Sequence, residues 1–60
     1  MMSKKMMIDV RVYSESGKMS FERYEIDDFE FCVRDGRVYF IAGGKRMNFP
    51  LEDVSQVYMV

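Results

Sequence analysis

The fold is decided by residues 30–49, EFCVRDGRVYFIAGGKRMNF, in which Asp35-Gly36 and Gly43-Gly44 each separate two runs of strand-forming residues. Two-residue pairs of this kind are the strongest short-range signal for a β-hairpin. Together they predict a three-stranded antiparallel meander with a defined register. Its cross-strand pairs are Arg34–Arg37, Val33–Val38, Cys32–Tyr39, Phe31–Phe40 and Glu30–Ile41, followed by Ala42–Lys45, Ile41–Arg46, Phe40–Met47, Tyr39–Asn48 and Val38–Phe49.

Both hairpin registers sort the meander residues into the same two faces. A slip of one residue in either hairpin would turn every side chain of a strand to the other face, so this agreement is informative. The predicted inner face is apolar and consists of Phe29, Phe31, Val33, Val38, Phe40, Ala42, Met47 and Phe49. The predicted outer face consists of Glu30, Cys32, Arg34, Arg37, Tyr39, Ile41, Arg46 and Asn48.

Two further strands are predicted before the meander. Residues 8–12 alternate apolar and polar side chains, which is typical of a half-buried strand, and residues 14–17 form a turn. In residues 18–26 the apolar parity changes along the segment. This phase change predicts either a β-bulge near Glu22-Arg23 or an irregular excursion.

After the meander, Pro50 cannot continue a central strand. Residues 50–54 predict a single 3₁₀ turn with Leu51 and Val54 pointing inward. Residues 55–60 predict a last strand. This strand buries either Val57 and Met59, which we favour, or Tyr58 and Val60.

No segment shows a helical apolar period, so the chain is predicted to be all-β. The order of its elements resembles that of the SH3-like small barrel, with five to six antiparallel strands and a 3₁₀ turn before the last one. The aromatic peptide-binding motif and the tryptophan of SH3 domains are absent, and the N-terminal helix of Sm-like rings has no counterpart. A resemblance in element order implies no function. The alternative fold is a small open β-sandwich.

Composition limits the architecture and the location. Sixty residues predict a single domain over 1–60, with residues 1–5 frayed. One cysteine and no histidine exclude an internal disulfide and argue against structural zinc, and no cofactor is expected. The first apolar run ends at Asp9, too early for a signal peptide, and no stretch has membrane-spanning length. These features predict a cytoplasmic protein without membrane contact.

Six outer-face residues of the meander are the candidate partner-binding site and are called here the arginine–tyrosine face: Arg34, Arg37, Tyr39, Ile41, Arg46 and Asn48. Arginine and tyrosine are enriched among residues that dominate binding energy at interfaces. The opposition of Arg34 and Arg37 is unfavourable in a purely structural hairpin. The simpler interpretation is that the arginines only keep the outer face hydrated.

Other motifs do not support catalysis. Gly43-Gly44-Lys45-Arg46 lacks the first glycine and the Ser or Thr of a phosphate-binding loop. The acidic run 22–30 lacks the ligand spacing of a calcium loop and is predicted to be a solvated loop. Cys32 has no histidine to activate it, so it is predicted to be an inert, half-buried thiol. We therefore expect no enzyme activity and no catalytic residues.

The sequence thus predicts a non-catalytic protein–protein interaction module, an accessory or inhibitor protein that docks on a larger partner. Such small stand-alone chains are common in phages and mobile elements. A homo-oligomer is also predicted, with methionines such as Met6 and Met7 beside an edge strand as a contact surface, although the simpler interpretation is that the methionines fill gaps at the ends of the barrel. The alternative is a single-strand nucleic-acid binder that uses the same face, with Tyr39 stacking on a base. The sequence pI of about 5.2 disfavours nucleic acid as the partner.

Overall fold

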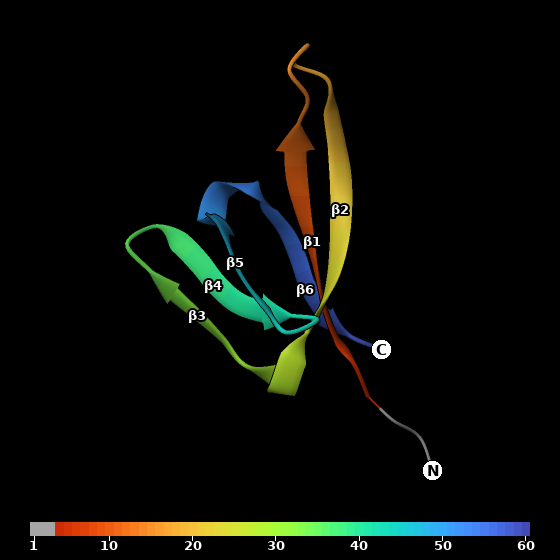
Figure 1. Ribbon diagram of the computed structural model, residues 1–60, viewed down its shortest axis with the longest axis vertical. Helices are drawn as coiled ribbons and strands as arrows, with labels where there is room; N and C mark the ends of the chain where they lie inside the picture. Colours follow the sequence, from red (N-terminus) through yellow and green to blue (C-terminus); the bar gives the residue numbers. More distant parts are fainter. Residues whose placement is uncertain (1–3) are drawn as a thin grey trace.

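The computed structural model describes residues 4–60 and shows two three-stranded antiparallel sheets (Figure 1). The first sheet has the order β2-β1-β6, with β1 at Met6–Tyr13, β2 at Met19–Ile26 and β6 at Val54–Met59. The second sheet has the order β3-β4-β5, with β3 at Phe31–Arg34, β4 at Arg37–Ala42 and β5 at Lys45–Pro50. Two 3₁₀ turns, η1 at Asp27–Phe29 and η2 at Leu51–Asp53, connect the sheets.

The predicted meander register is confirmed along its whole ladder. Every predicted pair from Phe31–Phe40 to Ala42–Lys45 is present, and the second hairpin adds Arg37–Pro50. The predicted pair Glu30–Ile41 lies just outside this ladder. Both turns have positive φ at their two central residues, 53° and 72° at Asp35 and Gly36 and 59° and 79° at Gly43 and Gly44. This backbone is the type I′ turn, whose twist matches that of the flanking strands.

The hydrophobic core lies between the two sheets. Ile8, Val10 and Ile26 of the first sheet pack against Val38 and Phe40 of the second. An aromatic cluster covers one side of this core. Its rings belong to Tyr24 of β2, Phe40 of β4 and Phe49 of β5, with centroids 5.8 to 6.1 Å apart. The cluster joins β2 to β4 and β5, and so holds the two sheets together on that side.

The sheets do not close into a barrel, and the structure corresponds to the alternative, an open β-sandwich. Among the described strands, neither β3 nor β5 pairs with an edge strand of the first sheet, so edge strand β3 is left uncovered. Phe31 and Val33 share the inner face with Phe40 and Val38, as predicted, but 44% and 51% of their surface is exposed. Phe29 lies in η1, outside the sheet, and is exposed as well. Parity along a strand therefore predicts the face of a residue but not its burial.

The prediction of a bulge or an irregular excursion in residues 18–26 is wrong. Strand β2 pairs with β1 residue for residue, from Tyr13–Met19 to Met6–Ile26, without a bulge. The parity change instead reflects a difference between the two ends of the strand. Tyr24 and Ile26 face the core, whereas Met19 and Phe21 are exposed on the opposite face of β2. The far end of the β1–β2 hairpin projects past the other strands (Figure 1).

The irregularity that does occur lies in the last strand. The register between β1 and β6 shifts between Asp9 and Val10, which pair with Gln56 and Val54, so Ser55 is the extra residue of a β-bulge. The predicted 3₁₀ turn is present as η2, and Val54 packs against the core, but Leu51 is exposed rather than inward.

Beyond the bulge, Val57 pairs with Ile8 and Met59 with Met6, which confirms their predicted parity. Both side chains are nevertheless exposed, so the prediction that they are buried is wrong. The ladder extends one residue further, because Lys5 and Val60 exchange two backbone hydrogen bonds of 3.0 and 2.9 Å. Of the predicted frayed segment 1–5, residues 1–3 lie outside the described residues. None of residues 4–60 belongs to a helix long and apolar enough to span a bilayer.

Candidate partner-binding face

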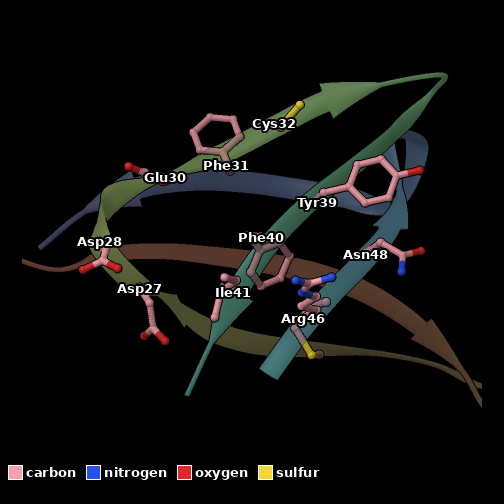
Figure 2. Close-up of a pocket in the computed structure, with 11 residues that line it drawn as sticks. Asp27, Asp28, Glu30, Phe31, Cys32, Tyr39, Phe40, Ile41, Arg46 and Asn48 are labelled. Atoms are coloured by element: carbon pink, nitrogen blue, oxygen red, sulfur yellow. The ribbon is translucent and has the colours of Figure 1, made fainter. Parts of the chain in front are cut away.

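The structure places all six residues of the arginine–tyrosine face on β3, β4 and β5. The register sets Tyr39 of the central strand opposite both Cys32 and Asn48, and sets Ile41 opposite Arg46. Tyr39, Ile41, Arg46 and Asn48 line a hollow of about 430 Å³ on this sheet (Figure 2), whereas Arg34 and Arg37 are not among its lining residues. The β-hairpin register thus brings together residues that span 15 positions of the sequence, from Arg34 to Asn48.

The two opposed arginines each have a separate partner on the same face. Arg34 and Arg37 are directly opposite, as predicted. The guanidinium of Arg34 lies over the ring of Tyr39, 5.3 Å from its centroid. Arg37 donates two hydrogen bonds to Oδ1 of Asn48, from Nε at 3.1 Å and from a terminal nitrogen at 2.7 Å. These contacts direct the two charges apart and hold four side chains of the face in place, which reduces the entropy lost on binding.

The face has an apolar centre and oppositely charged ends. Ile41 is 45% exposed next to Tyr39, while Arg34 and Arg37 lie at the Asp35-Gly36 end. At the other end the hollow is lined by Asp27, Asp28 and Glu30 as well as by Arg46 (Figure 2). The sequence placed Glu30 on the outer face of the meander, but it treated Asp27 and Asp28 only as part of a solvated loop.

A single contact explains why the acidic residues lie there. The Oδ2 atom of Asp27 accepts a hydrogen bond of 2.9 Å from the backbone N–H of Gly44. Asp27 is 17 residues away from Gly44, so η1 is anchored to the second meander turn. A contact between two loops that lie this far apart in the sequence cannot be predicted from local sequence patterns.

Cys32 lies on the same sheet face with an exposed thiol. It is therefore more accessible than the half-buried thiol that the sequence predicted. Among residues 4–60, no three side chains of the His, Cys, Asp and Glu types are grouped so that they could hold a metal ion.

Sequence reasoning missed a second polar cluster, on the outer face of the other sheet. Asp9 of β1 is only 7% exposed, although it points away from the core. Its Oδ1 accepts a hydrogen bond of 2.9 Å from Nε of Arg23 on β2, and its Oδ2 accepts one of 2.8 Å from Gln56 on β6. Arg23 also lies over the ring of Tyr58, 5.7 Å from its centroid. Both carboxylate oxygens are occupied, so the cluster ties three strands together rather than offering a reactive group.

The hydrogen bond from Arg23, and secondly that from Gln56, lowers the pKa of Asp9 below its ordinary value of 3.8. A carboxyl group whose pKa is lower in the folded than in the unfolded chain stabilises the fold above the unfolded pKa. That stabilisation is lost as the pH falls through the folded value. The cluster should therefore contribute to stability at neutral pH and should not contribute in strong acid.

We expect Asp9→Asn to lower the free energy of unfolding at neutral pH. Asp9 accepts hydrogen bonds from Arg23 and Gln56, and the N–H₂ group of an asparagine cannot accept the bond from one of these two donors. The difference between wild type and variant should shrink as the pH falls below 3.8. Urea unfolding at a series of pH values measures this difference. Glu15→Gln, which removes an exposed carboxylate from the β1–β2 loop, is the control and should leave stability unchanged. A difference for Asp9→Asn that is constant with pH would contradict the assignment.

Comparison with known protein families, with curated proteins and with solved structures gives no match to this chain.

Proposed function

We propose that this protein is a non-catalytic interaction module that docks on a larger protein through its arginine–tyrosine face. In this role it is a self-associating accessory or inhibitor protein, of the kind that phages and mobile elements encode. The observation that carries the proposal is the composition of the face. Exposed apolar area at Ile41 and the half-buried ring of Tyr39 are surrounded by charged and hydrogen-bonding side chains, the arrangement typical of protein–protein interfaces.

The charges of the face favour a protein over a nucleic acid. A nucleic-acid groove needs positive charge along its length to follow the phosphate backbone. Here Asp27, Asp28 and Glu30 line one end of the same hollow that holds Arg46. These carboxylates repel phosphates locally, and they offer a protein partner a second set of contacts beside the arginines.

The contacts within the face support a binding role for particular residues. Tyr39 is held under Arg34, and Arg37 is held by Asn48, so both side chains are ordered before a partner arrives. Ordered aromatic and arginine side chains at the centre of an interface commonly contribute the most binding energy. Arg37 and Tyr39 are therefore the residues whose loss should matter most.

We expect Arg37→Ala combined with Tyr39→Ala to reduce recovery of the protein partner at least about tenfold, since residues of this class each contribute on the order of 2 kcal/mol when they dominate an interface. The measurement is affinity capture from cells that naturally contain the protein, with quantitative mass spectrometry. Circular dichroism should show an unchanged fold, because neither residue belongs to the core.

The matched control for that capture is Tyr13→Ala with Lys18→Ala. It removes one tyrosine and one cation from exposed positions of the β1–β2 hairpin and should leave capture unchanged. Equal recovery by wild type and by the Arg37/Tyr39 variant would rule out this face as the docking site.

Titration with fluorescent single-stranded oligonucleotides at low and moderate salt tests the alternative function, single-strand nucleic-acid binding. Salt-sensitive binding that is lost in the Arg37/Tyr39 variant would replace the proposal with a nucleic-acid role.

A further inference from the structure

Strand β3 is an unprotected sheet edge. It lies at the end of the order β3-β4-β5, and all four of its residues are exposed. Phe31 and Val33 expose about half of their surface on the inner face. Natural proteins usually protect such an edge with proline, a bulge or inward-pointing charges. In β3 the inward-pointing residues are apolar, so the edge is suited to pairing with another strand.

The free backbone groups of β3 follow from the hairpin. Arg34 and Arg37 flank a two-residue turn and therefore form a hydrogen-bonded pair. Because the pattern alternates along an antiparallel ladder, Cys32 also bonds to β4, whereas Phe31 and Val33 direct their N–H and C=O groups away from it. The free edge thus presents two donors and two acceptors, from residues 31 and 33.

We propose that β3 pairs in antiparallel orientation with β3 of a second copy of this chain, about a two-fold axis at Cys32. Such an axis, perpendicular to the sheet, keeps every residue on its own face and pairs residues whose numbers sum to 64. Phe31 then pairs with Val33 of the second copy through the free backbone groups, and the apolar side chains meet on the inner face. Cys32 faces Cys32 as a non-hydrogen-bonded pair.

Charge complementarity selects this register. On the outer face it places Glu30 opposite Arg34 of the second copy, and the symmetry creates this pair twice. Glu30 has extended backbone angles, φ −115° and ψ 130°, so it continues the line of β3. Within residues 4–60 neither Glu30 nor Arg34 forms an ion pair. Arg34 already lies over Tyr39, and its guanidinium retains several donors for a carboxylate.

The other three sheet edges do not have this complementarity. A two-fold axis near the centre of β2 would place Glu22 or Arg23 opposite its own copy, and like charges directly opposite are destabilising. Strand β5 ends in Pro50, which has no N–H to donate. Strand β6 contains the bulge opposite Asp9 and Val10, which bends its edge. Among the edge strands within residues 4–60, only β3 presents apolar residues and opposite charges in self-complementary positions.

The predicted dimer has a continuous sheet of six strands. Both arginine–tyrosine faces lie on the same side of this sheet, with the two copies of β3 at its centre. The inference deepens the self-association included in the proposed function and identifies its interface. A four-residue strand buries little surface, so the dimer should be weak and depend on protein concentration.

Charge exchange tests the register. Sedimentation equilibrium of the full chain, with reductant present, should show a monomer–dimer equilibrium. Glu30→Arg alone opposes Arg34 of the second copy, and Arg34→Glu alone opposes Glu30, so each single variant should be monomeric. The double variant Glu30→Arg/Arg34→Glu restores opposite charges and should restore the dimer. Misfolding cannot produce this recovery, and a dimer that is insensitive to the exchange would overturn the register.

Cys32 provides a second, independent measurement. Treatment with diamide, which takes up the two hydrogens of the paired thiols, should link two chains through a Cys32–Cys32 disulfide on a non-reducing gel. Cys32→Ser with Asn48→Cys moves the exposed thiol to β5 and should abolish this link. Glu30→Arg should reduce it as well.

A protein that stays monomeric at every concentration, or a cross-link that forms equally from position 48, would overturn the proposal. Failure of partner docking remains distinguishable from failure of the dimer. Arg37→Ala with Tyr39→Ala should weaken partner capture and leave the β3 dimer intact, since neither side chain lies on the β3 edge.

Discussion

Phe40→Ala should have the largest effect of any substitution considered, a loss of about 3–5 kcal/mol in the free energy of unfolding. Phe40 is 5% exposed, and its ring lies 6.1 Å from that of Tyr24 and 6.0 Å from that of Phe49. Removing a buried phenylalanine ring costs about 3–5 kcal/mol, because burial is lost and a cavity remains. A domain of 60 residues has a total stability of roughly 3–9 kcal/mol. The loss therefore removes about a third or more of the total stability, since this ring contacts both sheets.

Urea unfolding followed by circular dichroism measures this effect. The matched control is Phe21→Ala, the same substitution at an exposed position on the face of β2 away from the core, which should change stability by less than about 0.5 kcal/mol. If Phe21→Ala destabilises the chain as much as Phe40→Ala does, the face assignment of β2 is wrong. That result would revive the bulge that the sequence predicts near residues 22 and 23.

Gly43→Ala combined with Gly44→Ala should have the second largest effect, a loss of roughly 2–4 kcal/mol, since a left-handed backbone costs an L-residue about 1–2 kcal/mol. Both glycines have positive φ, 59° and 79°. A Cβ atom added at either position would meet no other atom within 4 Å. The cost is therefore purely conformational, and it falls on the turn that sets the β4–β5 register.

Gly43→Asn is the control for this turn. Asn-Gly is a preferred type I′ pair, so stability should be unchanged or slightly higher. Thermal unfolding of the three proteins measures the order. If the double alanine variant is as stable as wild type, the turn does not require left-handed backbone, and the register argument built on it fails.

The meander could be predicted from the sequence because its information is local. Asp35-Gly36 and Gly43-Gly44 each occupy two positions with positive φ, and a turn of that geometry aligns the flanking strands without reference to the rest of the molecule. The positions of Tyr39, Ile41 and Asn48 on the outer face follow from the strand period of two. For that reason the candidate face was predictable to the residue, whereas its function remains a proposal.

Burial was less predictable because it depends on how far one sheet covers the other. Phe31, Val33, Val57 and Met59 have the expected parity, but they lie on edge strands that the opposite sheet does not cover. Likewise, the parity change in residues 18–26 has two explanations that a sequence cannot separate. One is a bulge, and the other is a regular hairpin that projects beyond the core, which the structure shows.

By itself, the sequence determined the all-β class, the meander register and the identity of the arginine–tyrosine face, because turn geometry and side-chain alternation act over a few residues. The tertiary structure alone decided that the sheets stay open, that Asp27 reaches the turn at Gly44, and that Asp9 joins Arg23 and Gln56. These contacts connect residues 14 to 47 positions apart. Such pairings arise only when the two sheets pack, because packing is what brings distant strands and loops within hydrogen-bonding distance.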